Sequence, residues 1–539
     1  MSSMTAPSLA GERPDGPRLD SKPGPMTLLL FVGLLAGGLL FTAWNLVQDV
    51  NAVDAPITTY VPFILLGVAL LIALGFEFVN GFHDTANAVA TVIYTHSLPP
   101  NAAVLWSGLF NFLGVLTSSG AVAFGILSLL PVELILQVGS SAGFAMVFAL
   151  LIAAIVWNLG TWWLGLPASS SHTMIGSIIG VGIANALMHG RDGTSGVDWG
   201  QVTKVGYSLL LSPLVGFVCA ALLLLLLRRL VKNRQLFDEP QADAPPPLWI
   251  RGLLVLTCTG VSFAHGSNDG QKGMGLIMLI LVGTVPMAYA LNRAMPADQT
   301  SHFIAIAGDA QRAIERSLPT LTERAPSADA ARSELSAYVR TQQVQPGVLP
   351  ALAALAGEIA AQAQQSGSLA RVPLQRVSNM RNDMYLASEA IRLLDKSGAL
   401  DPDAKAAVAT LRGELDKATK FIPLWVKVAV AVALGLGTMV GWKRIVVTVG
   451  EKIGKTHLSY AQGASAELVA MATIGAADGF GLPVSTTHVL SSGVAGTMAA
   501  NQSGLQMATL RNLLMAWVLT LPAAVLLSGS LYWLFTRLF

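Results

Sequence analysis

Long apolar runs separated by short polar segments dominate the chain. Several runs reach or approach the roughly 20 residues that an α-helix needs to cross a bilayer. They are 26–46, 61–79, 144–164, 207–227 and 515–535. No Lys or Arg occurs between Lys22 and Arg191, a stretch too apolar for a soluble domain to expose. The pattern predicts an all-α polytopic membrane protein.

The composition changes abruptly within the second half. Residues 293–421 hold nearly half of the charged residues in about a quarter of the chain, and several stretches have helical spacing. We expect a small helical extramembrane insertion there; a partly disordered linker is the alternative. The predicted organisation is a disordered N-terminal tail (1–25), a first transmembrane half (26–235), a linker (236–248), the start of the second transmembrane half (249–292), the soluble helical insertion (293–421) and the remainder of the second half (422–539).

Two short motifs each occur twice, once in each half. GFHDTAN at 81–87 is matched by GSNDGQK at 266–272, and LPASSSH at 166–172 is matched by LPVSTTH at 482–488. Ser169 follows Asp84 by 85 residues, and Ser485 follows Asp269 by 87 once residues 293–421 are left out. Duplicated, Gly/Pro-interrupted apolar segments indicate the binding site of a transporter. We therefore expect two repeats whose motifs meet near the middle of the membrane.

The Pro-Ser/Thr clusters predict an anion site. Proline is well placed in the first turn of a helix, and Ser or Thr then caps the helix while other backbone N–H groups stay unpaired. Two such helix ends can surround one tetrahedral oxyanion. The alternative is that the hydroxyls only bond within membrane helices. The candidate oxyanion-binding residues are Ser169, Ser170, Ser171, Ser485, Thr486, Thr487 and, from the second Asp motif, Lys272.

The Asp-centred motifs require a different argument. A buried carboxylate flanked by Asn suits a hard cation or a proton. Such a carboxylate repels a neighbouring anion until a cation or proton neutralises it. Binding of the anion is therefore coupled to binding of the cation or proton. Lys272 stands opposite Asn87 and lysine has no acceptor, so we favour H⁺ over Na⁺; a static Lys272–Asp269 pair is the alternative. The candidate residues for cation or proton coupling are Asp84, Asn87, Asp269, Asn268, Gln271 and His83.

Other ionisable groups lie in or beside these motifs. His172 and His488 occupy matched positions, and His265 precedes the second Asp motif. Glu77 and Glu467 lie in apolar segments. We consider them proton-handling or supporting groups, because histidine titrates near neutral pH and carboxyls inside a membrane are usually functional. A satisfied structural role is the alternative.

The four linked motifs resemble those of the PiT family of inorganic phosphate transporters, and GSNDGQKG at 266–273 looks like the motif of the bacterial low-affinity Pit type. The resemblance implies two inverted-topology repeats with re-entrant half-helices, a phosphate site between them and a homodimer. Asp84, Asn87 and Asp269 match positions associated with cation binding in sodium-coupled members, whereas Lys272 and His83 depart from the family pattern. Bacterial relatives are associated with proton-driven uptake, often of a neutral complex of phosphate with Mg²⁺ or another divalent metal.

The resulting hypothesis is a secondary active transporter of the bacterial inner membrane that takes up inorganic phosphate by symport with H⁺. A Na⁺-coupled phosphate symporter and a sulfate or related oxyanion permease are alternatives on the same fold. From another class, two intramembrane aspartates suggest an aspartyl protease, but the Gly-x-Gly-Asp motif of such enzymes is replaced here by Gly-Phe-His-Asp and Ser-Asn-Asp.

The hypothesis also sets the expected partners. We expect no catalytic residues and no resident cofactor, and the sequence does not identify a metal site. The expected partners are phosphate and the lipid bilayer. A formal net charge of +2 gives no indication of nucleic acid.

Overall fold

A computed structural model describes residues 17, 19, 24–52, 61–84, 86–130, 140–240, 244–318 and 326–538. The side chains of residues 86, 87 and 195 also lie outside this description. The predicted disordered tail (1–25) therefore falls almost entirely outside the described residues.

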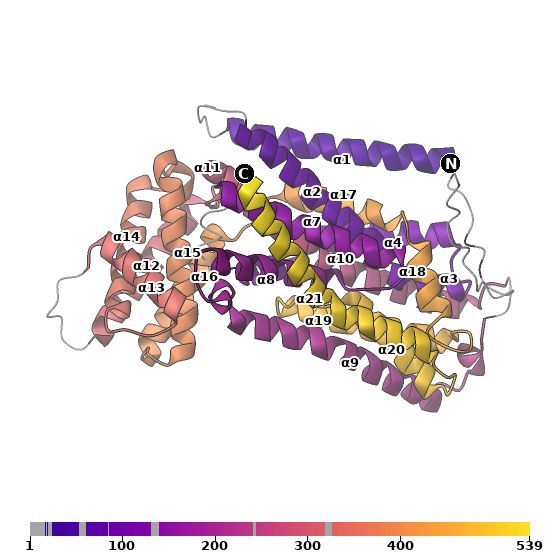
Figure 1. Ribbon diagram of the computed structural model, residues 1–539. Helices are drawn as coiled ribbons and strands as arrows, with labels where there is room; N and C mark the ends of the chain where they lie inside the picture. Colours follow the sequence, from indigo (N-terminus) through magenta and orange to yellow (C-terminus); the bar gives the residue numbers. More distant parts are fainter. Residues whose placement is uncertain are drawn as a thin grey trace.

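Apolar helices form an elongated bundle with the charged segment at one end (Figure 1). The first half contains α1 (Pro25–Asn51), α2 (Val61–Asp84), α3 (Ala86–Tyr94), α4 (Pro100–Thr117), α5 (Ala121–Leu127), α7 (Ser141–Trp163), α8 (Ser170–Met188) and α9 (Trp199–Leu230). The second half contains α10 (Leu248–Thr284), α11 (Pro286–Tyr289), α17 (Leu424–Thr438), α18 (Lys443–Glu451), α19 (Tyr460–Gly479), α20 (Thr486–Ala500) and α21 (Met507–Leu538).

Length and apolar composition suit these helices to a membrane. Within the described residues, 7 helices are long and apolar enough to cross one, or up to 9 if each bent pair counts as one span. The bent pairs are α4 with α5, at 75°, and α16 with α17, at 71°.

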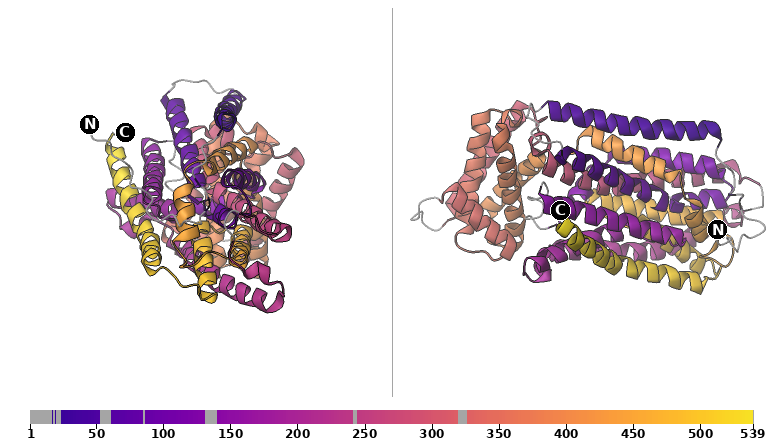
Figure 2. Two further views of the ribbon diagram at one scale, coloured as in Figure 1. Left: turned by 90° about the vertical axis from the view of Figure 1, so that its right-hand side faces the viewer. Right: turned by 45° about the horizontal axis from the view of Figure 1, so that its top comes forward.

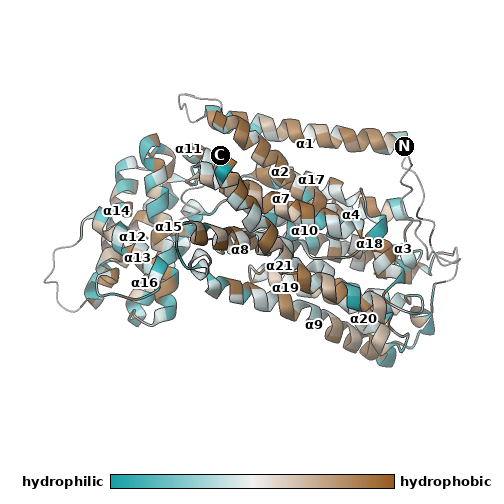
Figure 3. Ribbon diagram, viewed as in Figure 1, coloured by the Kyte–Doolittle hydropathy of each residue, from teal (hydrophilic) through white to brown (hydrophobic). Residues whose placement is uncertain are grey.

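Hydrophobic residues predominate along the helices of the bundle (Figure 3), and many of the large ones are exposed. On α9, Leu210 and Leu214 are 71% and 58% exposed, whereas Gly216 and Ala220 on the same helix are buried. Such a continuous exposed apolar face is rare on soluble proteins. The helix therefore has a lipid-facing side and a small-residue side on which other helices pack.

The first Asp-motif helix, α2, packs closely on α17 of the other half. A Cβ added at Gly81 would lie 2.2 Å from the carbonyl oxygen of Leu434. In the other direction, a Cβ at Gly437 would lie 2.1 Å from the carbonyl oxygen of Phe78. The two helices approach at distances that only glycine permits.

The second Asp-motif helix, α10, makes the equivalent contact with α4. A Cβ at Gly266 would lie 2.1 Å from the carbonyl oxygen of Asn111, and a Cβ at Gly114 would lie 2.1 Å from that of Phe263. Each contact residue of α2 has its counterpart 185 residues later on α10, and each contact residue of α4 has its counterpart 323 residues later on α17. The two halves therefore make the same pair of contacts, in each case with a helix of the opposite half.

The helices that follow the Pro-Ser/Thr clusters also exchange partners. Helix α8 packs against α21, and α20 packs against α9. A Cβ at Gly180 of α8 would lie 2.2 Å from the Val525 carbonyl oxygen of α21, and one at Gly496 of α20 would lie 2.1 Å from the Phe217 carbonyl oxygen of α9. Helices α9 and α21 each contain 32 residues and one internal proline.

Residues 293–421 form five α-helices that pack around a separate hydrophobic core. They are α12 (Ala297–Ser317), α13 (Ala328–Thr341), α14 (Val348–Ser366), α15 (Leu374–Ser397) and α16 (Pro402–Thr419). Figure 2 shows them beyond one end of the bundle. Arg392 of α15 forms an ion pair with Asp198 at the start of α9, at 2.7 Å. This group is called the insertion below.

Two basic segments lie at the end of the bundle opposite the insertion. Helix α9 starts at the insertion and, at about 1.5 Å per residue, its last turn with Arg228 and Arg229 lies far from it. Lys455 lies at the same end, since Arg228 contacts Asn501 and the Lys455 N–H donates to the Gly504 carbonyl oxygen at 3.1 Å.

Candidate functional site

Each Pro-Ser/Thr cluster ends in a capped helix. Ser169 and Ser485 have extended backbones, and their side chains accept the backbone N–H groups of His172 and His488, each at 3.2 Å. A capping hydroxyl acts as the acceptor. Ser169 and Ser485 therefore start the helices, and the hydroxyls that follow them face other partners.

The hydroxyls after the caps contact the two motif aspartates. Thr487 donates to Asp84 at 2.7 Å, and Thr486 donates to Asp269 at 3.4 Å. Ser170 donates to Asp84 and lies 3.3 Å from Asp269. All five side chains are buried. The structure thus brings the four motifs together at one centre, with Ser170 between the carboxylates.

Basic groups adjoin both carboxylates. Lys272 Nζ lies 2.5 Å from an Asp269 oxygen, and His265 Nε2 lies 3.6 Å from the same oxygen. His83 Nδ1 lies 3.0 Å from Asp84. Lys272 is fully buried, and a buried charge requires a partner. Lys272 therefore balances the charge of Asp269, whereas His83 is the basic group beside Asp84.

Three of these groups are arranged as metal ligands are. One ligand atom each of Asp84, His265 and Asp269 lies within 4.8 Å of the others. Carboxylate and imidazole together suit divalent transition metals, and carboxylate alone suits Mg²⁺. The sequence analysis considered His265 a proton-handling or supporting group and did not predict a metal site, although the i, i+4 spacing to Asp269 puts both side chains on one face of α10.

Ser171 and Asn268 support the centre without contacting its carboxylates. Ser171 donates to the carbonyl oxygen of Val484 at 2.7 Å. Asn268 donates to that of Leu482 at 3.1 Å. Both contacts hold the chain just before Ser485, so these two side chains position the second cluster.

Gln271 and Asn87 are the remaining candidates. Gln271 donates to Asp478 at 2.6 Å and accepts the Val122 N–H at 2.9 Å. Its amide joins α10 to α19 and α5, and does not contact the motif aspartates. Asn87 lies in α3 by its backbone, and its side chain is outside the described residues.

Glu77 of α2 is a third buried carboxyl beside the centre. A Cβ at Gly273 would lie 2.3 Å from its Cγ, and both Lys272 and Asp269 act on it electrostatically. Its Oε2 accepts from Asn80 at 3.4 Å, whereas its Oε1 has no hydrogen-bond partner among the described residues. An unpartnered buried carboxyl oxygen requires an explanation.

The matched histidines of the two clusters meet. The ring centroids of His172 and His488 are 4.6 Å apart, and the His488 ring stacks on Trp517 at 4.1 Å. Two equivalent residues, 316 apart in sequence, are therefore neighbours in space.

Comparison with known proteins agrees with the motifs. The sequence model of the phosphate transporter family matches residues 80–528. The chain is 44% identical over 492 residues to the low-affinity inorganic phosphate transporter PitA of Escherichia coli (strain K12). The alignment covers 87% of this chain and 96% of PitA. It is 41% identical to PitB of the same strain, with 88% and 97% covered.

A solved structure described as "The sodium-dependent phosphate transporter" has a similar fold. Its TM-score is 0.50 at 20% identity, and the alignment covers 88% of this chain and 100% of that chain. At this identity the likeness concerns the fold alone.

Proposed function

Because the chain belongs to the phosphate transporter family, we propose that it is a secondary active transporter that takes up inorganic phosphate across the bacterial inner membrane by symport with H⁺. The observation that carries the proposal is the buried ion pair of Lys272 with Asp269. The Ser170 hydroxyl lies between Asp269 and Asp84 and contacts both carboxylates. The relatives are named as transporters, and this disfavours the aspartyl protease.

We infer that the bundle consists of two inverted-topology repeats with re-entrant half-helices. The exchanged glycine contacts of α2 with α17 and of α10 with α4 support this inference. So does the contact between His172 and His488, because a residue meets its own equivalent only near a two-fold axis. The 75° bend between α4 and α5 suits a re-entrant turn.

The hydroxyls provide the link between proton and phosphate. Ser170, Thr486 and Thr487 now donate to carboxylates, and one hydroxyl proton cannot serve two acceptors fully. A protonated carboxyl is a weaker acceptor than a carboxylate. Neutralising Asp84 therefore releases donors for phosphate and removes the repulsion between the two anions.

Glu77 is the group that we propose as the carrier of the coupled proton. It is fully buried, one of its oxygens has no partner among the described residues, and it lies within the electrostatic influence of Lys272. Lys272 can therefore favour the charged form of Asp269 or of Glu77, but not fully of both. If the Lys272 amine moved from one of these carboxyls to the other, the carboxyl that it left would have to take up a proton.

Lys272 also disfavours Na⁺. A Na⁺ ion needs oxygen acceptors, and at the position equivalent to Asn87 this chain offers only an ammonium group. With its amine on Asp269, Lys272 takes the place of a cation at the second motif.

A neutral complex of phosphate with Mg²⁺ or another divalent metal is the second form of substrate that we propose. The arrangement of Asp84, His265 and Asp269 favours it. In that form the metal is cargo, and these residues bind it while the hydroxyls bind the phosphate. A homodimer stays a prediction from the family resemblance.

Uptake of labelled phosphate into proteoliposomes tests the substrate. We expect saturable uptake that a tenfold excess of sulfate leaves largely intact, because protonated phosphate can donate to a carboxylate and sulfate cannot. Abolition of uptake by sulfate would instead identify an oxyanion permease. Repeating the assay with and without Mg²⁺ distinguishes the two forms of the substrate.

A further inference from the structure

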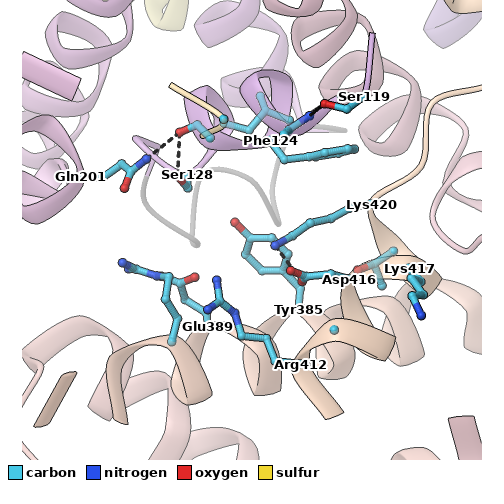
Figure 4. Close-up of a pocket in the computed structure, with 18 of the residues that line it drawn as sticks. Ser119, Phe124, Ser128, Gln201, Tyr385, Glu389, Arg412, Asp416, Lys417 and Lys420 are labelled. Atoms are coloured by element: carbon cyan, nitrogen blue, oxygen red, sulfur yellow. Dashed lines mark hydrogen bonds and ion pairs between the residues drawn. The ribbon is translucent and has the colours of Figure 1, made fainter. Parts of the chain in front are cut away.

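A cavity of about 720 Å³ lies where the insertion meets the bundle. Figure 4 shows Ser119, Phe124 and Gln201 on its bundle side, facing Tyr385, Arg412 and Lys420 of the insertion segment. The cavity is large enough for a small anion with several waters.

The lining is strongly basic. Among the described residues, seven basic and three acidic side chains line the cavity. Arg392 is neutralised by Asp198 and Glu389, and Lys420 by Asp416 at 2.7 Å. Lys417 is paired with Glu414 at 2.7 Å, and Asp395 with Lys405 at 2.9 Å. Within the described part of the chain, no carboxylate forms an ion pair with Lys204, Lys396, Arg381 or Arg412.

Two arginines carry the excess charge. Arg381 is 9% exposed and Arg412 is half-buried. The Nε–H groups of both have no hydrogen-bond partner in the part of the chain that is described. Burial lowers the pKa of Arg381, as expected for a guanidinium that has lost water without gaining an anion. Buried guanidinium donors of this kind match the oxygens of an oxyanion.

The bundle side of the cavity leads toward the cluster of Asp84, Asp269, Ser170 and Lys272, called the transport centre below. Gly481, which lines it, precedes Ser485 by four residues. A Cβ at Gly125, also in the lining, would lie 2.9 Å from the Gly481 carbonyl oxygen. Val122 of the same short helix donates to Gln271, two residues from Asp269. An anion in the cavity therefore lies beside the segment that carries the second cluster.

We propose that this cavity is a second, outer binding site for inorganic phosphate, at the boundary between the insertion and the bundle. The identity of the anion rests on the proposed function. Phosphate held there is concentrated beside the transport centre, as a basic cleft concentrates an anionic substrate. Lipid headgroups carry the same phosphate chemistry, so the test separates the two sources.

The first experiment counts bound phosphate on the purified full chain in lipid-free detergent, by equilibrium dialysis with labelled inorganic phosphate. We expect two per chain for the wild type and one for Arg381→Gln/Arg412→Gln, which removes both of the unbalanced arginines. The matched control Arg312→Gln removes an exposed basic charge from α12 of the insertion and should still bind two. One phosphate in both the wild type and the double variant would overturn the outer site alone, whereas no binding would contradict the proposed function as well. Displacement by phosphatidylglycerol would identify a lipid headgroup and overturn the proposal.

The second experiment measures initial uptake against phosphate concentration. Arg381→Gln/Arg412→Gln should raise KM about three- to tenfold at low ionic strength with kcat unchanged. The difference should shrink in high salt because screening weakens charge attraction. Arg312→Gln should leave KM unchanged. Equal KM values for the wild type and the double variant would contradict a role in uptake.

Discussion

At the scale of single residues, the transport centre is a small set of charges held away from water. Asp84 and Asp269 share Ser170, and Lys272 balances only one of them. Asp84 accepts from Ser170 and Thr487 and adjoins His83, and a buried carboxylate needs such partners. If phosphate takes these hydroxyl donors, a proton or a metal has to replace them, and this is the basis of the coupling that we propose.

Replacement of Lys272 tests the balance. Lys272→Met leaves Asp269 buried without its cation, which should lower the free energy of unfolding by about 3–5 kcal/mol. Lys272→Met/Asp269→Asn should recover most of that loss without restoring phosphate uptake. Denaturant unfolding in detergent measures the first effect, and proteoliposome uptake measures the second. A single variant as stable as the wild type would show that Asp269 does not need the lysine.

Replacement of Glu77 tests the proton carrier. Glu77→Gln keeps shape and removes the titratable group, so phosphate exchange at equal concentrations should persist while accumulation driven by a pH gradient is lost. Glu451→Gln is a matched control. Glu451 of α18 is also buried, but it accepts a hydrogen bond from Tyr94 of α3. The measurement is labelled-phosphate exchange and accumulation in the same liposomes. Normal accumulation by Glu77→Gln would exclude Glu77 as the carrier.

At the scale of helices, glycine contacts position the centre. The Asp-motif helices carry Gly81 and Gly266, and each of these glycines meets a carbonyl oxygen of a helix from the opposite half. Contact at this distance fixes the rotation of α2 and α10 and hence the direction of both aspartates. The small residues serve helix packing in the membrane, where close approach replaces the hydrophobic effect.

An added methyl group should destabilise the protein at one glycine of an Asp-motif helix and not at another. Gly266→Ala places a Cβ 2.1 Å from the Asn111 carbonyl oxygen, and we expect a loss of about 1–3 kcal/mol or more from overpacking. Gly67→Ala on α2 is the control, since nothing lies within 4 Å of its added Cβ. It should be neutral or slightly stabilising. Thermal unfolding of the purified variants compares the two, and equal melting temperatures would contradict the close contact.

The sequence predicts the helices and motifs better than it predicts their contacts. Apolar runs and the duplicated spacing indicate a polytopic helical protein, and the capping role of Ser169 and Ser485 follows from the Pro-Ser pattern. The partners of Ser170 and Thr487 do not follow from any pattern, because those bonds span 86 and 403 residues. Asn268 and Gln271 belong to motifs that indicate ion binding, yet tertiary packing turns both toward other segments.

At the scale of the whole molecule, the insertion and the basic segments lie at opposite ends of the bundle. Short basic loops favour the cytoplasm, whereas long loops are largely exempt from this rule. Residues 228–234 and 443–455 are short and basic. We therefore expect the insertion, and the outer phosphate site that we propose, to lie on the periplasmic side.

Cysteine labelling in intact cells tests this orientation. In a background with Cys219 and Cys258 replaced by serine, Gln343→Cys in the insertion should react with a membrane-impermeant maleimide, because Gln343 is exposed. Lys232→Cys at the opposite end should react only after permeabilisation. The reverse pattern would put the insertion in the cytoplasm and would make the outer site a product site.

Proteoliposomes under one imposed gradient at a time distinguish proton coupling from sodium coupling. With Na⁺ absent and the outside acidic, labelled phosphate should accumulate inside above its external concentration. An inward Na⁺ gradient without a pH difference should give no accumulation. Uptake that requires Na⁺ would contradict the role assigned to Lys272 and would make Asp84 and Asn87 the candidate ligands of a sodium ion.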